Sequence, residues 1–126
     1  MKRFEHRTAR SMTEAVRLLK AYEGKARVNA GGTDLLGAMR DKSLPSYPEA
    51  VIDIKTIEGL DYIERDGKGL RIGALAKLAD VAASETVKAE YGLLTEAIRT
   101  VASPTLRNMA TIGGNLAQDV RCWYYR

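Results

Sequence analysis

Two pairs of adjacent glycines are the residues of this sequence best suited to binding chemistry. Gly31-Gly32 is followed by Thr33-Asp34, and Gly113-Gly114 stands between Thr111-Ile112 and Asn115. Glycine lacks a Cβ, so it can adopt a positive φ and let a ligand approach the backbone closely. We therefore predict a turn at each pair, and each turn is a candidate binding element.

The combination of the two turns is more informative than either turn alone. After the first turn the sequence predicts a helix, whose unpaired N–H groups and dipole favour a phosphate. A single Gly-Gly turn is more often a tight connection without a ligand, but two turns from different subdomains could hold the pyrophosphate of a dinucleotide between them. Neither the P-loop spacing Gly-x-x-x-x-Gly-Lys-Ser/Thr nor the Rossmann Gly-x-Gly-x-x-Gly occurs. The usual nucleotide-binding fingerprints therefore do not explain the pair.

The elements that must position the first turn alternate between strands and helices. Ser11 and Glu14 have the spacing of a capping box ahead of an amphipathic helix, and the later strand is a β-branched run. We expect strands near Phe4, at 26–30 and at 50–54, and helices at 11–24 and 33–42. Right-handed crossovers would make the strands parallel, so residues 1–58 are expected to form a β-α-β-α-β subdomain.

The second turn belongs to a different kind of unit, which we expect to begin at residue 59. Asp66–Gly69 marks the turn of a β-hairpin. Residues 76–102 are rich in apolar residues at helical spacing and fit two helices, the second of which ends at Pro104. Residues 59–126 would then be the first part of a second subdomain, giving an α+β chain.

Composition excludes several classes of protein. The chain has 126 residues, 45% of them hydrophobic and 29% charged, and no apolar run approaches the ~20 residues that span a bilayer. The formal charge is +4, but Lys and Arg are spread among nearly as many acids rather than clustered, which disfavours nucleic-acid binding. A lone cysteine and the lack of an export signal favour a cytoplasmic protein.

Three segments of the sequence resemble a known family. Val28–Leu36, Leu70–Ala74 and Arg107–Leu116 are similar to the signatures of the molybdopterin dehydrogenase FAD-binding domain, a PCMH-type domain. The family includes the flavin domain of xanthine dehydrogenase and the medium subunits of carbon monoxide dehydrogenase and 4-hydroxybenzoyl-CoA reductase. The resemblance covers essentially the whole chain and implies the two-subdomain flavin fold that vanillyl-alcohol oxidase also has.

The resemblance also implies a cofactor, its contacts and its partners. FAD would be bound by residues from both subdomains, namely Asn29, Ala30, Gly31, Gly32, Thr33, Asp34, Leu35 and Leu36 in the first, and Val101, Thr111, Ile112, Gly113, Gly114 and Asn115 in the second. For Val101 a buried core position is an equal alternative. The parent enzyme would carry electrons between an acceptor and two partners, a molybdopterin-containing large subunit and a [2Fe-2S] small subunit. FAD itself supplies the redox chemistry, so we expect no catalytic acid or base, and we expect His6 to be structural.

Cys122 is a candidate metal ligand by the same resemblance. The run 115–125 looks like the 4-hydroxybenzoyl-CoA reductase branch, where an extra loop carries four cysteines for a [4Fe-4S] cluster, and Cys122 matches the first of them. A single thiolate cannot hold a cubane cluster. We therefore expect Cys122 to be an accessible thiol in this chain and a cluster ligand only in a longer parent protein, with a packed core cysteine as the alternative.

The family pattern extends beyond this sequence. Further strands of the second subdomain and a C-terminal domain are expected in the family, so the fold would be incomplete at its C-terminus and the isolated chain would bind FAD weakly or not at all. The competing hypothesis is a truncated, non-catalytic fragment that folds without flavin, or that self-associates into a homo-oligomer through an exposed strand edge.

Overall fold

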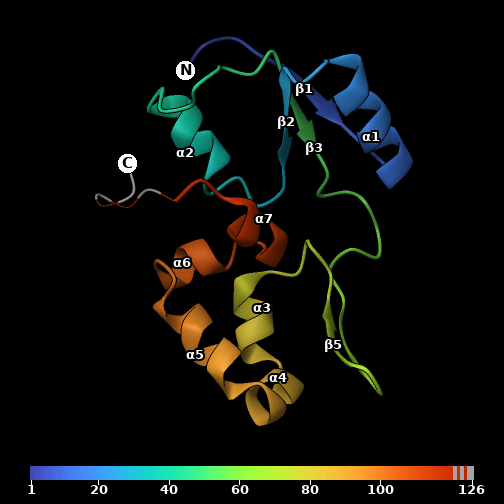
Figure 1. Cartoon of the computed structure of the whole chain (residues 1–126), viewed down its shortest axis with the longest axis vertical. Helices are drawn as coiled ribbons and strands as arrows, with labels where there is room; N and C mark the ends of the chain where they lie inside the picture. The colour runs from blue at the N-terminus through green and yellow to red at the C-terminus, as the bar shows by residue number, and fades with distance from the viewer. Residues whose placement is uncertain (121, 123, 125–126) are drawn as a thin grey trace.

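The computed structural model of the chain describes residues 1–120, 122 and 124, and the remaining four residues lie outside it. Two parts follow one another along the long axis of the molecule (Figure 1). The upper part holds a three-stranded sheet with two helices, and the lower part holds a β-hairpin with the remaining helices. Among the described residues, no helix is long and apolar enough to cross a membrane.

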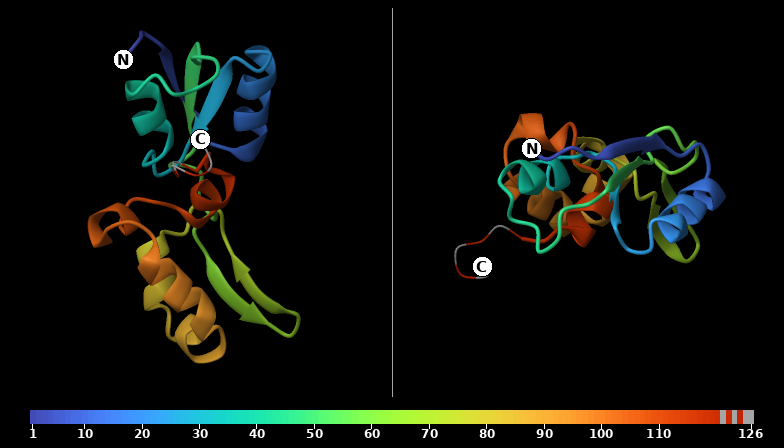
Figure 2. Two further views of the ribbon diagram at one scale, coloured as in Figure 1. Left: turned by 60° about the vertical axis from the view of Figure 1, so that its left-hand side comes forward. Right: turned by 90° about the horizontal axis from the view of Figure 1, so that it is seen from above.

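The upper part is a parallel sheet in the strand order β1-β3-β2. Its elements are β1 (Glu5–Thr8), α1 (Met12–Ala21), β2 (Ala26–Asn29), α2 (Leu35–Arg40) and β3 (Ala50–Asp53). Both strand pairs are parallel, and all four residues of the central strand β3 are buried. The alternation of strands and helices and the parallel pairing of the strands, both expected from the sequence, are confirmed. The helices α1 and α2 flank the sheet on opposite sides (Figure 2).

The first helix begins where the sequence predicts it to begin. The side chain of Ser11 accepts a hydrogen bond from the backbone N–H of Glu14 (3.1 Å), and the Glu14 carboxylate accepts one from the backbone N–H of Arg10 (2.9 Å). Capping of this kind satisfies N–H groups that have no partner within the helix. One face of α1 then packs on the sheet, in a cluster of buried residues that comprises Ala9, Ala15, Ala26, Ala50, Ile52 and Ile57.

The lower part departs from the sequence prediction in the number of its helices. The hairpin is present as the antiparallel strands β4 (Ile63–Asp66) and β5 (Gly69–Ile72). The two helices expected over 76–102 are instead three: α3 (Leu78–Ala83), α4 (Glu85–Glu90) and α5 (Gly92–Thr100).

Ser84 is the physical reason for the extra helix. Its backbone is non-helical, with φ −59° and ψ 124°, and its side chain accepts a hydrogen bond from the N–H of Val87. Ser84 therefore ends α3 and caps α4. The helices and the hairpin enclose a second cluster of buried residues, Ala76, Leu78, Val81, Val87 and Ile98.

Pro104 starts a helix instead of ending one, so that prediction was wrong as well. The helix α5 stops at Thr100, and Pro104 is the first residue of α6 (Pro104–Arg107), where its missing N–H costs nothing. Ser103 caps α6 by accepting a hydrogen bond from the N–H of Leu106 at 3.3 Å. The last helix, α7 (Ile112–Ala117), lies at the junction between the two parts (Figure 2).

The two parts meet through backbone contacts. A Cβ added to Gly31 would overlap the carbonyl oxygen of Met109 and come within 3.0 Å of the Cα of Ala110. The N–H of Leu78 donates to the carbonyl of Ala110 at 2.9 Å, which ties this segment to the helices of the lower part. Only a residue without a side chain can occupy position 31 in this packing.

Gly31→Ala should therefore destabilise the protein. The added methyl group must push apart two backbone segments, and overpacking of this kind costs roughly 1–3 kcal/mol. Gly67→Ala is the matched control, because a Cβ at Gly67 meets nothing within 4 Å. Chemical denaturation followed by circular dichroism measures both variants, and an equal free energy of unfolding for the two would contradict the packing at this junction.

Candidate functional site

A cleft of about 500 Å³ lies between the two parts and is lined by both glycine pairs. This volume is within the range of about 300–1,000 Å³ that is usual for ligand sites. The expectation that the two glycine pairs face one concave space is confirmed. All the residues expected to contact FAD line this cleft except Leu36 and Ile112.

The two exceptions have other surroundings. Leu36 is 40% exposed on α2, one residue beyond the part of the segment that lines the cleft. Ile112 is half-buried and packs against the core of the lower part, although it is the first residue of α7 and its neighbours Thr111 and Gly113 do line the cleft.

The first glycine segment lines the cleft and holds backbone donors that are not engaged elsewhere in the described structure. Gly32 has a φ of +75°, and its carbonyl accepts the N–H of Leu36 (3.2 Å), so the helical hydrogen bonding of α2 begins at Gly32. Within the described residues, the backbone N–H groups of Gly31, Gly32 and Leu35 donate to no other group. N–H groups without partners on a concave surface are suited to the oxygens of a phosphate.

Asn29 adds an unusual polar atom to the same wall. It ends β2, its residue is only 5% exposed, and its side-chain oxygen Oδ1 is buried without a hydrogen-bond partner in the described structure. Such an orphaned acceptor costs about 1–3 kcal/mol. A Cβ on Gly32 would lie 3.1 Å from this oxygen, so the glycine also leaves it room. An acceptor held in this way fits a ligand that brings its own donor.

The second glycine pair is not a turn, and that prediction is corrected. Gly113 and Gly114 lie in the first turn of α7, which Thr111 caps by accepting the N–H of Gly114 at 3.2 Å. The N–H groups of Ile112 and Gly113 donate to the carbonyls of Ala76 and Ala74. A Cβ on Gly113 would lie 2.8 Å from the Ala74 oxygen. Glycine is therefore needed here so that α7 can pack closely, and this segment is a wall of the cleft rather than a second set of phosphate donors.

Val101 is half-buried, and its contact with FAD stays a prediction. It is the C-cap of α5, it packs against the core of the lower part, and it also lines the cleft. Sequence reasoning missed its neighbours Ala102, Leu106 and Arg107, which line the cleft as well. Arg107 is the first residue of the segment Arg107–Leu116, which resembles the family. Its place in this segment was the sequence signal that could have identified it as a residue of the cleft.

Two arginines contribute positive charge to the lining of the cleft. Arg27 donates from Nη1 to the carbonyls of Gly24 and Ala26, both at 3.0 Å, and Arg107 likewise donates to backbone carbonyls. Within the described residues, neither arginine forms an ion pair with a carboxylate. Asp34 and Asp119 also line the cleft, so it holds charges of both signs.

His6 belongs to an ion-pair group on the sheet. Its Nε2 lies 3.6 Å from Oδ2 of Asp53, which also contacts Nζ of Lys55 at 3.0 Å. None of the three is among the residues that line the main cleft. Burial alone would raise the pKa of Asp53, but hydrogen bonds from Lys55 and the nearby charges of Lys55 and His6 outweigh it and hold the pKa of Asp53 below its usual value.

Cys122 is a free, half-exposed cysteine. Among the described residues, no three His, Cys, Asp or Glu side chains are grouped so that they could hold a metal ion. Its role as a cluster ligand therefore stays a prediction about a longer protein. The preceding and following residues, Arg121 and Trp123 of the run 115–125, lie outside the described residues.

Comparison with known proteins identifies the family. Residues 2–121 match the model of the FAD binding domain in molybdopterin dehydrogenase. The chain belongs to this family. It is 41% identical to the aldehyde oxidoreductase FAD-binding subunit of Escherichia coli (strain K12), covering 99% of this chain and 38% of that one. It is 39% identical to the carbon monoxide dehydrogenase medium chain of Hydrogenophaga pseudoflava, covering 91% and 39%.

Solved structures share the fold. A carbon monoxide dehydrogenase from Hydrogenophaga pseudoflava that lacks the Mo-pyranopterin moiety superposes with a TM-score of 0.85 at 38% identity, covering 91% of this chain and 39% of the other. Quinoline 2-oxidoreductase from Pseudomonas putida 86 gives 0.84 at 28% identity, covering 93% and 41%. The α+β flavin fold expected from the sequence is confirmed, and the fragment without flavin is not favoured. The chain spans about two fifths of the length of these relatives.

The lowered pKa of Asp53 predicts loss of stability in acid. A carboxylate with a depressed folded pKa stabilises the protein above its unfolded pKa of about 3.9, and the contribution is lost as the pH falls through the folded value. Asp53→Asn should therefore unfold more easily at neutral pH, and its free energy of unfolding should fall less steeply with acid. Asp61→Asn, at an exposed residue, is the control. Parallel pH profiles for wild type and Asp53→Asn would refute this assignment.

Proposed function

We propose that the cleft binds FAD, and that the chain is the FAD-binding portion of the flavoprotein subunit of a molybdenum hydroxylase. The observation that carries the proposal is the first glycine segment, where Gly31, Gly32 and Leu35 line the cleft and their N–H groups have no partner within the described residues. Membership of an FAD-binding family supports the identity of the ligand. When bound, FAD supplies the electron-transfer chemistry.

The two walls of the cleft fit different parts of a dinucleotide. We infer that the backbone of Asn29–Leu35 holds the pyrophosphate, and that the buried oxygen of Asn29 accepts a hydrogen bond from a hydroxyl or N–H group of the ligand. Val101, Thr111 and residues 113–115 then form the opposite wall, against the flavin ring system. The apolar residues of this wall would exclude water from one side of the ring.

The parent enzyme and its partners are proposed from the relatives. Relatives are named as medium chains or FAD subunits of dehydrogenases, which supports an assembly with further chains. We propose a molybdopterin-containing large subunit and a [2Fe-2S] small subunit as partners, with electrons passing between them and an acceptor. We also propose a cytoplasmic location, which a lone cysteine fits. The proposed boundary near residue 58 is supported by the two separate core clusters.

Titration with FAD tests the proposal. We expect weak but saturable binding, because the chain spans about two fifths of the length of its relatives and supplies only part of the surface that can enclose a ligand. Gly32→Val should abolish binding, because it fills the space beside Asn29. Binding is followed through the absorbance and fluorescence of the flavin.

Gly59→Val is the matched control for this titration. Gly59 also has a positive φ of +71°, but a Cβ there meets nothing within 4 Å, so both variants carry the same kind of backbone strain. We expect Gly59→Val to bind FAD as the unaltered chain does. Absence of saturable binding by the unaltered chain, or equal binding by both variants, would overturn the proposal, whereas tight stoichiometric binding would contradict only the expected affinity.

A further inference from the structure

The connection between α5 and α6 forms one wall of the cleft. Val101 and Ala102 both line it, and Val101 also packs against the core of the lower part. Ala102 has a φ of +46°, in the left-handed region, where a residue with a Cβ is disfavoured. A conformation of this kind persists only where surrounding contacts hold it in place.

Arg107 supplies those contacts. Its Nη1 donates to the carbonyl oxygens of Arg99, Val101 and Ala102, at 3.1, 2.7 and 3.1 Å. The last carbonyls of a helix have no partners within the helix, and a cation at this end also interacts favourably with the helix dipole. One guanidinium group thus fixes both the end of α5 and the strained residue that follows it.

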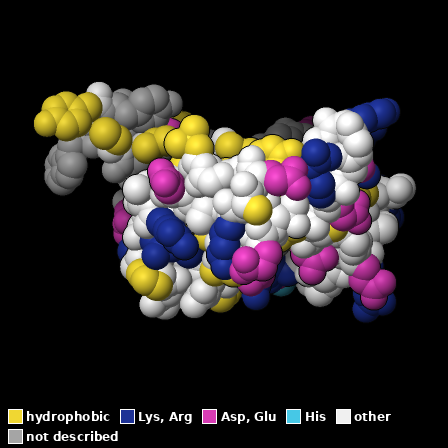
Figure 3. Space-filling view, turned by 90° about the horizontal axis from the view of Figure 1, so that it is seen from below, with side chains coloured by type: hydrophobic (Ala, Val, Ile, Leu, Met, Phe, Trp, Pro, Cys, Tyr) yellow, Lys and Arg dark blue, Asp and Glu magenta, His cyan; other side chains and the backbone are white. Residues whose placement is uncertain are grey.

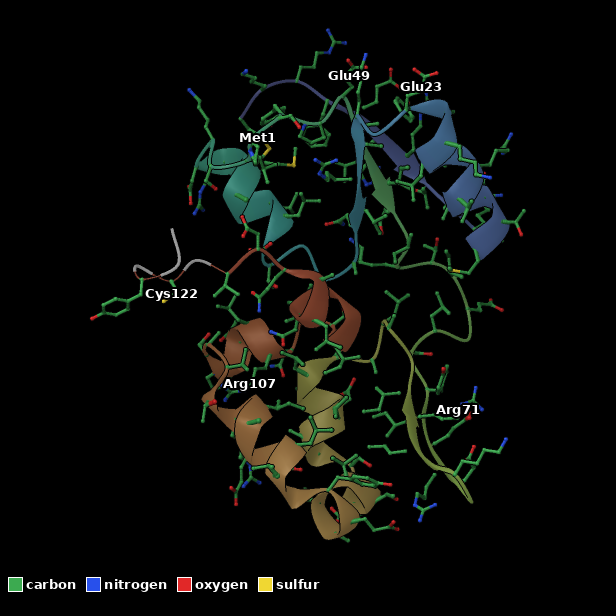
Figure 4. All side chains as sticks on the ribbon, viewed as in Figure 1. Met1, Glu23, Glu49, Arg71, Arg107 and Cys122 are labelled. Carbon is green, nitrogen blue, oxygen red and sulfur yellow. The ribbon has the colours of Figure 1, made fainter. Side chains whose placement is uncertain are left out.

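The short helix α6 places the side chain of Arg107 beside the end of α5. Its single turn begins with Ser103 as the cap and Pro104 at the first position, and Arg107 is its last residue. Figure 4 labels Arg107 on α6, beside the end of α5. The side chain is half-buried and lines the cleft together with the segment that it holds.

We propose that Arg107 is a positioning residue for the flavin, because it fixes the wall formed by Val101 and Ala102. This inference rests on the proposed function of the cleft. No carboxylate among the described residues pairs with Arg107, so the guanidinium binds the carbonyls instead of neutralising an acid. The neighbouring Arg99, which is exposed and whose side chain forms no hydrogen bond or ion pair within the described residues, has no such role.

Two variants and one control test the proposal. Arg107→Lys keeps the charge but loses the planar fork, and Arg107→Gln loses both, while Arg99→Gln is the control. In the chain without ligand, the N–H of Val101 donates to Ile98 at 3.0 Å, and hydrogen exchange at this amide should become about tenfold faster in both Arg107 variants. Their FAD affinity should fall about tenfold, and the absorption band of the bound flavin should shift.

Ala102→Gly separates positioning from stability. Glycine tolerates the left-handed conformation, so Ala102→Gly should restore the melting temperature of Arg107→Lys. It should not restore FAD affinity or the flavin band, because the wall stays loose. If Ala102→Gly restored FAD affinity and the flavin band as well as the melting temperature, the role of Arg107 would be structural only, and the proposal would be overturned.

The outcomes distinguish this inference from the proposed function. Unchanged exchange at Val101 in the Arg107 variants would overturn the inference, whatever the cleft binds. Faster exchange with unchanged FAD affinity and spectrum would overturn it as well. If the unaltered chain binds no FAD, the proposed function fails and the positioning role fails with it. FAD binding by the unaltered chain that Arg107→Lys retains in full would refute only the inference.

Discussion

The close approach of two backbone segments, at Gly31 and at Met109-Ala110, is the constraint on which the other features depend. No side chain fits between them, so the first glycine segment is held directly against the chain that leads into α7. Within the lower part, Gly113 of α7 packs closely on Ala74 in the same manner. The contact at Gly31 holds the two parts of the molecule close together, and the cleft is the space that remains beside it.

The two walls of the cleft have different physical roles. The wall from the upper part is polar at its backbone, with donors at Gly31, Gly32 and Leu35 and the orphaned oxygen of Asn29. In the wall from the lower part, the N–H groups of Gly113, Gly114 and Asn115 already donate to other groups of the protein, as does that of Val101 at the end of α5. One wall is therefore suited to phosphate and the other to an apolar ring. The surrounding surface carries interspersed acidic and basic side chains where it is seen from the lower end (Figure 3), without one dominant sign of charge on that face.

Local rules were sufficient to predict the upper part and the β-hairpin, but not the helices of the lower part. The capping pair Ser11 and Glu14 and the β-branched strand around Ile52 are short-range signals, and the structure has both elements. The break at Ser84 was missed because apolar spacing continues across it. The role of Gly113 could not be read from its type, since glycine serves equally for a positive φ and for close packing, and only the position of Ala74 decides between the two. Arg107 was missed because its acceptors are backbone carbonyls at and just beyond the end of α5, which no local pattern around Arg107 indicates.

Backbone amide chemical shifts recorded during a titration with FAD test the two-walled cleft most directly. We expect the amides of Gly31, Gly32 and Leu35 to shift most, because their N–H groups would gain acceptors. The amides of Gly113, Gly114 and Val101 already donate hydrogen bonds within the protein. Their chemical shifts should therefore change less, but at the same FAD concentrations. Shifts confined to one of the two parts, or centred on residues outside the cleft such as the hairpin β4–β5, would contradict the two-walled cleft.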